Sequence, residues 1–286
     1  KVYWPAEGYT KGDLIRHYEQ VADLLLPYLM DRPVHMLRYP DGIEGKSFYQ
    51  RQAPEGLPEW FPTETVVSRS SDETHRHMVC TSRDAILWLV NMGSIDLHPW
   101  MSRVGSLESP DYVVIDLDPG SAPFRDVVRV ARVVGRILRG IGAQPALKTS
   151  GKSGLHIHVA LRRGYSYEQG RMFAEGVARA VCRELPEIAT VERNVGSRGS
   201  RVYLDFMQNR TGQTVVPPYV VRPVRGAQVS APLAWDELEL AIEPSQFTIQ
   251  TLPERLARHG DLFRPSLDTG LDLLDAVNAL QELLRS

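Results

Sequence analysis

The sequence has 286 residues, 43% of them hydrophobic, and a formal net charge of −2 from 33 Lys and Arg against 35 Asp and Glu. A chain of this length and composition can bury a large core, and its balanced charge excludes a uniformly basic coat for nucleic acid. No apolar run approaches the roughly 20 residues that a membrane-spanning helix needs, so we expect no membrane partner. The two cysteines, Cys80 and Cys182, lack metal-ligand spacing, which favours reduced, buried thiols and a cytoplasmic location.

The first third of the chain predicts a helix followed by strands. Residues 10–30 fit a helix that begins at the capping hydroxyl of Thr10 and ends before Pro33. Residues 34–38 and 47–52 fit two strands of a hairpin around the turn residues at 40–42. The polar stretch 68–77 is typical of an exposed loop.

The rest of the chain alternates helices and strands. We expect a helix over 83–92, a strand within 111–120, a helix from Pro123, a strand over 155–161, a helix over 167–185 and a strand over 201–206. The tail after Asp261 fits a closing amphipathic helix. This alternation predicts an α/β or α+β domain in which helices pack on a sheet.

The strand within 111–120 ends in two carboxylates, Asp116 and Asp118. Successive side chains of a strand point to opposite faces, so these two project from the same face. Adjacent acids repel unless a cation lies between them, and Mg²⁺ and Mn²⁺ prefer oxygen ligands of this kind, often together with substrate phosphates. A solvated turn after the strand is an equally good interpretation, because Asp-Pro-Gly at 118–120 is a common turn sequence.

Residues 148–158 form a second stretch, in which a loop of small residues leads into a strand. Glycines allow close backbone approach, hydroxyls and amides supply hydrogen-bond donors and Lys152 supplies charge, a combination that suits a polyphosphate. The stretch is not a P-loop, because a strand follows it and the G-x-x-x-x-G-K-[ST] spacing is absent. His156 and His158 share one face of that strand, so we expect both imidazoles to face a cleft or solvent.

A third carboxylate, Asp205, lies on the predicted strand at 201–206. It would complete a two-metal site, in which ions about 3.5 to 4 Å apart clamp the attacking and leaving oxygens. The alternative is an ion pair with a nearby arginine, since residues 190–226 contain six arginines against two acids. Taken alone, Asp205 favours the ion pair.

In this order, with the residues between them, the three stretches resemble the polymerase domain of bacterial DNA ligase D, the end-joining member of the archaeo-eukaryotic primase superfamily. The likeness covers nearly the whole chain, and its further motifs lie at 1–5, 9–13, 48–54, 97–100, 208–209, 218–219 and 222–232. It implies a primase-polymerase fold with an RRM-like catalytic sheet flanked by helices and an active site in a cleft on that sheet. One departure concerns Lys152, which precedes Ser153 where family members often have lysine directly before the second glycine. The role of Lys152 is therefore open.

The resemblance also implies roles for individual residues. It implies that two divalent ions, Mn²⁺ or Mg²⁺, are held by Asp116, Asp118 and Asp205. It implies that six residues contact the incoming nucleotide and its triphosphate, namely Ser150, Lys152, His156, His98, Gln208 and Arg222. It implies that the 5′ phosphate of a recessed DNA strand is captured by Lys1, Lys11 and Arg38. Phe48 matches an aromatic residue that stacks on DNA at the break.

The implied activity is template-directed nucleotidyl transfer from NTPs or dNTPs at double-strand breaks, by gap filling and terminal addition in non-homologous end joining, with a ribonucleotide preference. The implied partners are broken or gapped DNA with a 5′ phosphate, Ku and a ligase domain, and the implied location is the nucleoid. Residues 1–286 would form one domain, with a DNA-end-binding part over about 1–100, a catalytic core over about 101–235 and a helical closing segment over about 236–286. Two other classes stay open, a metal-dependent glycosyltransferase with an Asp-x-Asp pair and a non-catalytic end-binding module.

Overall fold

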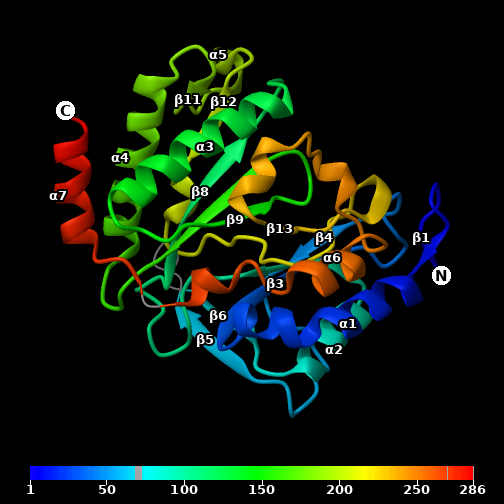
Figure 1. Cartoon of the computed structure of the whole chain (residues 1–286). Helices are drawn as coiled ribbons and strands as arrows, with labels where there is room; N and C mark the ends of the chain where they lie inside the picture. The colour runs from blue at the N-terminus through cyan, green and yellow to red at the C-terminus, as the bar shows by residue number, and fades with distance from the viewer. Residues whose placement is uncertain (68–72, 269, 286) are drawn as a thin grey trace.

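The computed structural model describes residues 1–67, 73–268 and 270–285, whose strands form two main sheets and a short ribbon (Figure 1). The first sheet, here called the catalytic sheet, has the order β11-β12-β8-β10-β9-β13. Neighbouring strands in it are antiparallel, except that β11 and β12 are parallel. Its strands are β8 (Tyr112–Asp118), β9 (Ala146–Thr149), β10 (Leu155–Ala160), β11 (Ala189–Thr190), β12 (Val202–Asp205) and β13 (Pro232–Leu233).

Two long helices, α3 (Phe124–Gly140) and α4 (Tyr167–Glu184), cover one face of the catalytic sheet (Figure 1). Ile115 and Leu117 of β8 and Ile157 of β10 are buried in the core that these helices close. Because side chains alternate along a strand, the intervening polar residues point to the opposite face. That opposite face carries the candidate site.

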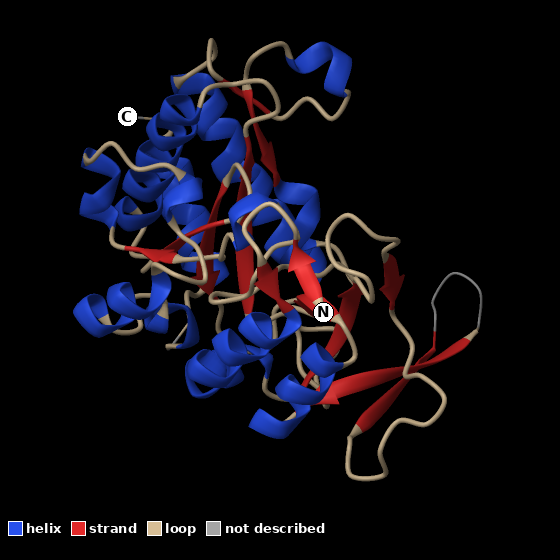
Figure 2. Cartoon of the chain, turned by 90° about the vertical axis from the view of Figure 1, so that its right-hand side faces the viewer, coloured by secondary structure: helices blue, strands red, loops and turns tan. Residues whose placement is uncertain are grey.

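The second sheet comes from the first hundred residues and has the order β4-β3-β6-β5, with β7 also paired to β3. The long β5 and β6 pair extends away from the rest of the molecule (Figure 2). Helices α1 (Lys11–Leu29) and α2 (Arg83–Asn91) pack against each other beside this sheet. The strands are β3 (Arg32–Arg38), β4 (Phe48–Gln50), β5 (Thr63–Val67), β6 (Thr74–Cys80) and β7 (Ser94–Pro99).

The remaining described elements are short or lie at the ends of the chain. Strands β1 (Val2–Trp4) and β2 (Tyr9–Thr10) form the ribbon, and α7 (Leu273–Leu283) packs on α4 (Figure 1). The other helices are α5 (Val195–Arg198), α6 (Leu252–His259) and the 3₁₀ helices η1 (Phe206–Asn209), η2 (Arg225–Ala227), η3 (Trp235–Glu239), η4 (Pro244–Gln246) and η5 (Arg264–Leu267). Within the described ranges, no helix has the length and apolar character needed to span a bilayer.

The predicted helices at 10–30, 83–92, 123 onward and 167–185, and the predicted strands, are confirmed. The helical tail is confirmed as η5 and α7. The predicted loop at 68–77 is wrong for residues 74–77, which begin β6, while 68–72 lie outside the described residues. Both cysteines are free, and Cys80 is buried as predicted, but the predicted burial of Cys182 is wrong, because its side chain is partly exposed. The division into three functional parts stays a prediction.

Candidate active site

Strand register places residues from four strands in one row across the catalytic sheet. Asp205 of β12 lies opposite Asp116 of β8, Asp116 lies opposite His156 of β10, and His156 lies opposite Lys148 of β9. Asp118 projects from the same face as Asp116 at the end of β8. The fold therefore gathers the three carboxylates, which the sequence placed on two separate strands.

A pocket of about 230 Å³ opens over this row. All nine of the predicted catalytic and nucleotide-binding residues line it, namely His98, Asp116, Asp118, Ser150, Lys152, His156, Asp205, Gln208 and Arg222. A larger cavity of about 850 Å³ lies elsewhere, at the Asp111 end of β8, and none of the predicted site residues line it. The chemistry of the lining, rather than cavity size, identifies the candidate site.

Burial and the neighbouring acids together change the protonation of Asp116. Burial, and then the neighbouring charges of Asp205 and Asp118, raise the pKa of Asp116 to about 7. Asp116 is enclosed except for the 22% of its side-chain surface that remains accessible. A cation over this end of the row would relieve the repulsion.

The donor set fits a divalent metal that arrives with its substrate. In the described part of the chain, no three His, Cys, Asp or Glu side chains converge as a ready-made metal cage. Mg²⁺ seldom uses such a cage, because it retains water ligands and binds one or two carboxylates together with substrate phosphates. Asp116 and its two acidic neighbours supply carboxylates of this kind beside a loop suited to phosphate.

Asp118 and Asp205 also have contacts of their own. Asp118 Oδ1 accepts a hydrogen bond from the Gly120 backbone at 3.1 Å, and its Oδ2 lies 3.5 Å from Arg198 Nη1. Asp205 Oδ1 accepts hydrogen bonds from the Met207 N–H at 2.9 Å and the Tyr203 hydroxyl at 3.2 Å. These bonds hold Asp205 at the start of η1, facing the pocket.

The loop before β10 closes on itself around Ser150. The Ser150 hydroxyl accepts hydrogen bonds from the backbone N–H groups of Lys152 and Gly154, at 3.2 and 3.0 Å. Gly151 has φ +72°, and a Cβ there would lie 2.5 Å from Arg222 Cγ. Glycine is therefore required for the loop to approach Arg222. Partial burial and the charge of Arg222 lower the pKa of Lys152 at the pocket rim.

Lys148 is a buried member of the site that the sequence did not assign. Its Nζ lies within hydrogen-bonding distance of His156 Nδ1, at 2.9 Å, and of Ser230 Oγ, at 2.7 Å. Burial lowers the pKa of both Lys148 and His156 well below their ordinary values. Lys148 thus orients the imidazole, whose Nε2 lies 3.4 Å from Asp116 Oδ1.

The expectation for His158 is wrong. Its ring is buried, stacked on Tyr112 at 4.7 Å between centroids and packed against Phe263 at 5.0 Å. It shares a face with His156, as predicted, but lies nearer the other end of β10, where aromatic rings cover that face. Burial lowers its pKa well below the ordinary histidine value.

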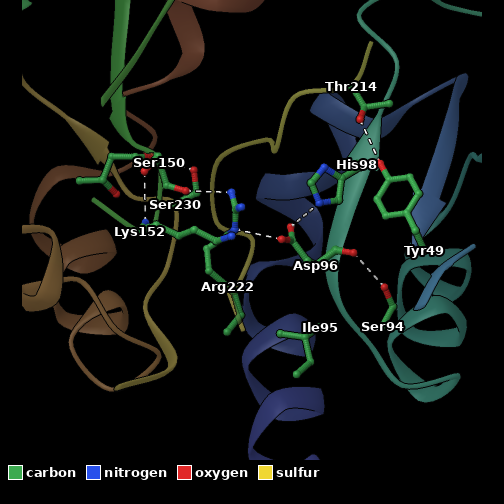
Figure 3. A network of polar contacts seen from close by, with 12 residues as sticks. Tyr49, Ser94, Ile95, Asp96, His98, Ser150, Lys152, Thr214, Arg222 and Ser230 are labelled. Atoms are coloured by element: carbon green, nitrogen blue, oxygen red, sulfur yellow. Dashed lines mark hydrogen bonds and ion pairs between the residues drawn. The ribbon is translucent and has the colours of Figure 1, made fainter. Parts of the chain in front are cut away.

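A second unassigned residue, Asp96 of β7, joins two predicted nucleotide ligands (Figure 3). Its Oδ2 lies 2.9 Å from Arg222 Nε and its Oδ1 lies 3.2 Å from His98 Nε2. Arg222 also donates to the backbone carbonyl of Ser150 at 3.0 Å. The alternation of polar and apolar residues over 94–98 was a signal that could have revealed this strand.

The four predicted DNA-end residues lie outside the pocket. Lys1 pairs with Asp41 at 2.5 Å, and the Lys11 backbone N–H bonds the Lys1 carbonyl. Both Lys11 and Arg38 donate to backbone carbonyls at the end of α2, at 2.6 and 2.7 Å. Arg38 lies over the ring of Phe48, 5.0 Å from its centroid, and Phe48 is 45% exposed. One of the three cations thus lies over an exposed aromatic ring, and the role of all three stays a prediction.

Comparisons with known proteins agree on one family. A model of the family described as LigD, primase-polymerase domain, matches residues 10–263. The chain is 32% identical over 280 residues to the bifunctional non-homologous end joining protein LigD of Bacillus subtilis, and 32% identical over 254 residues to the multifunctional LigD of Pseudomonas aeruginosa. These matches cover 96% and 88% of this chain but 45% and 30% of the relatives, so the chain spans less than half of their length.

A solved structure confirms the fold class. The polymerase domain from Mycobacterium tuberculosis ligase D, in complex with DNA, is similar with a TM-score of 0.87 and 29% sequence identity. The match covers 95% of this chain and 96% of that one. The mixed α/β fold predicted from the sequence is therefore that of a LigD polymerase domain.

Proposed function

The chain belongs to the LigD primase-polymerase domain family, a family of nucleotidyltransferases, and on that premise we propose that it performs template-directed nucleotidyl transfer at DNA breaks. The products would be filled gaps and terminal additions in non-homologous end joining. One observation carries the proposal. Three carboxylates from β8 and β12 and a loop suited to polyphosphate line a single pocket.

The acidic residues of the pocket would bind metal ions, and its basic and polar residues would bind the nucleotide. Asp116, Asp118 and Asp205 would hold two divalent ions, Mn²⁺ or Mg²⁺. Such ions, when bound, activate the attacking hydroxyl and neutralise the leaving group. The nucleotide triphosphate would be held by Ser150, Lys152, His156 and Arg222, with His98 and Gln208 at the rest of the nucleotide. Basic groups placed where negative charge develops stabilise the transition state.

The DNA would meet a separate surface. We assign the 5′ phosphate of the recessed strand to Lys1, Lys11 and Arg38, and stacking at the break to Phe48, whose exposed ring suits a base. A preference for ribonucleotides, and partnership with Ku and a ligase domain, are further parts of this proposal. These parts rest on the resemblance to the family, and the relatives' names support only a role in non-homologous end joining.

Primer extension tests the proposal. The substrate is a gapped duplex with a 5′ phosphate, supplied with Mn²⁺ and either ribonucleotides or deoxyribonucleotides. We expect the wild type to extend the primer, and the double variant Asp116→Ala with Asp118→Ala to lose activity by several orders of magnitude while it still binds the DNA. Fluorescence anisotropy measures that binding.

A matched control removes an acid outside the pocket. Asp126 lies on α3, behind the catalytic sheet, where it pairs with Arg129 at 3.4 Å. Asp126→Ala should extend primers as the wild type does. If a folded wild-type protein bound the DNA but added no nucleotide, the polymerase proposal would be abandoned for an end-binding module.

A further inference from the structure

Asp96 is a charged residue in a place where charge is costly. Its side chain is fully buried in β7, between Ile95 and Leu97, which belong to the hydrophobic core. Removing a carboxylate from water costs several kcal/mol unless its partners have good geometry. A buried ion pair is therefore weak evidence for a role in stability alone.

The partners of Asp96 both line the nucleotide pocket. Arg222 Nε and His98 Nε2 lie at opposite oxygens of the carboxylate, at 2.9 and 3.2 Å. Burial opposes the ionisation of Asp96, but the charges of Arg222 and His98 outweigh it and lower its pKa. The carboxylate thus stays charged between the two side chains.

These contacts restrict how each partner is presented. Arg222 is fixed on one side by Asp96 and on the other by the Ser150 carbonyl, which leaves its remaining N–H donors for a ligand in the pocket. His98 is held between Asp96 and Tyr49. Its ring packs edge-on against the Tyr49 ring, with centroids 5.5 Å apart, and the Tyr49 hydroxyl lies 3.1 Å from Thr214 Oγ1 (Figure 3).

We propose that Asp96 is a positioning residue of the nucleotide pocket, which acts on the incoming nucleotide through Arg222 and His98. Asp96 comes from the second sheet and Arg222 from the segment that precedes β13, so the carboxylate also joins two parts of the fold at the pocket. This inference rests on the proposed function, because it assigns both partners to the nucleotide.

Steady-state extension kinetics test the proposal on Asp96→Asn. The amide keeps the shape of the side chain but removes its charge, so Arg222 and His98 lose their anchor. We expect the KM for the incoming nucleotide to rise on the order of tenfold or more, and kcat to fall as well, because Arg222 also faces the charge that develops on the triphosphate. The affinity for DNA without nucleotide should not change, because the DNA-end residues do not contact Asp96.

A double-mutant cycle separates positioning from general stability. The part of the effect that Asp96 exerts through Arg222 is absent in an Arg222→Gln background, so adding Asp96→Asn there should raise the KM by much less than it does in the wild type. The double variant also removes the uncompensated buried charge, so it stays measurable even if Asp96→Asn alone does not fold, and a KM only slightly above that of Arg222→Gln is then the expected result. If the rise in KM of the double variant equalled the product of the two single rises, the residues would act independently and the proposal would be overturned.

Asp111 offers a matched control. It too is shared by two cationic side chains, with Arg32 at 2.5 Å and Arg103 at 2.7 Å, but it lies at the end of β8 away from the pocket. Asp111→Asn should lower the melting temperature and leave the KM unchanged. An Asp96→Asn protein with a lowered melting temperature and a wild-type KM would show that Asp96 is structural only. A wild type without extension would refute the proposed function itself, whatever Asp96 does.

Discussion

At the scale of residues, the site separates acids from nitrogen groups along one row of the catalytic sheet. Asp205 and Asp116 lie at one end, and His156 and the buried Lys148 at the other. Carboxylates are ligands for metal ions, and imidazole and amine nitrogens can donate hydrogen bonds to phosphate oxygens. A nucleotide that carries a metal would therefore find metal ligands at one end of the row and hydrogen-bond donors for its phosphates at the other.

The raised pKa of Asp116 makes metal binding depend on pH. In the metal-free protein this carboxyl titrates near pH 7, and a metal ligand must be deprotonated. Below pH 7 a proton competes with the metal, so apparent Mn²⁺ affinity should rise about tenfold per pH unit toward pH 7 and level off above it. Calorimetry between pH 5.5 and 8 measures this rise. Asp116→Asn should flatten it, and a wild-type affinity independent of pH would show that Asp116 is not a ligand.

Gly151 shows how one missing side chain sets the pocket. With φ +72° and Arg222 Cγ at 2.5 Å from an added Cβ, Gly151→Ala should destabilise the protein by more than about 1 kcal/mol. It should also displace Arg222 and raise the KM for nucleotide severalfold. Gly142 has φ +81° with open space around it. Gly142→Ala therefore introduces the backbone strain of a positive φ without a steric clash. Thermal melts and kinetics on both variants separate the two effects, and equal KM values would argue against contact with Arg222.

At the scale of elements, the sequence predicted those whose periodicity is strong. The apolar run of β8 ends in its two aspartates, and the helix at 10–30 has both a capping residue and an apolar face. Strand β7 was missed because its alternation covers only six residues and places Asp96 at a buried position. That burial depends on Arg222, more than a hundred residues away, which no local pattern reveals.

Strand order and register explain why the sequence predicted which residues form the site but not which of them lie next to one another. Asp116, Asp205 and His156 were each assigned to a strand face, yet their adjacency follows from the strand order β12-β8-β10. His158 was misplaced for a different reason. Periodicity gives the face of a strand, and only tertiary packing decides that Tyr112 and Phe263 cover one end of it.

Helix α1 begins with a capping box that can be tested by pH. The Thr10 hydroxyl accepts from the Asp13 N–H at 3.2 Å, and Asp13 Oδ2 accepts from the Thr10 N–H at 2.7 Å. Hydrogen bonds from the Thr10 side chain and backbone lower the pKa of Asp13 to about 2. Thr10→Ala should cost about 1 kcal/mol at neutral pH.

The pH dependence of that cost has a definite sign. A carboxyl with a lowered pKa stabilises the folded state above its unfolded pKa of about 3.9, and the contribution disappears as the pH falls through about 2. The difference between wild type and Thr10→Ala should therefore shrink as the pH falls from 4 toward 2. Denaturant melts measure it, and a difference constant over that range would show that Asp13 does not act through the cap.

At the scale of the whole molecule, a net charge of −2 means that the proposed DNA substrate would have to be bound by local basic groups rather than by the overall field. The candidate pocket lies between the two sheets, and the cations proposed for the DNA end lie with the ribbon and the second sheet. Binding of nucleotide and of the DNA end should thus be separable by mutation.

Lys11→Ala tests whether binding of the DNA end can be weakened without changing the binding of nucleotide. If Lys11 binds the 5′ phosphate, the variant should bind a phosphorylated recessed end more weakly, and the slope of log affinity against log salt should fall by about 1. On an unphosphorylated end it should match the wild type, and its KM for nucleotide should be unchanged. Arg125→Ala on the exposed side of α3 is the control for loss of any positive charge. Equal weakening on both DNA ends would place the phosphate away from Lys11, because a residue that contacts only that phosphate cannot affect a duplex that lacks it.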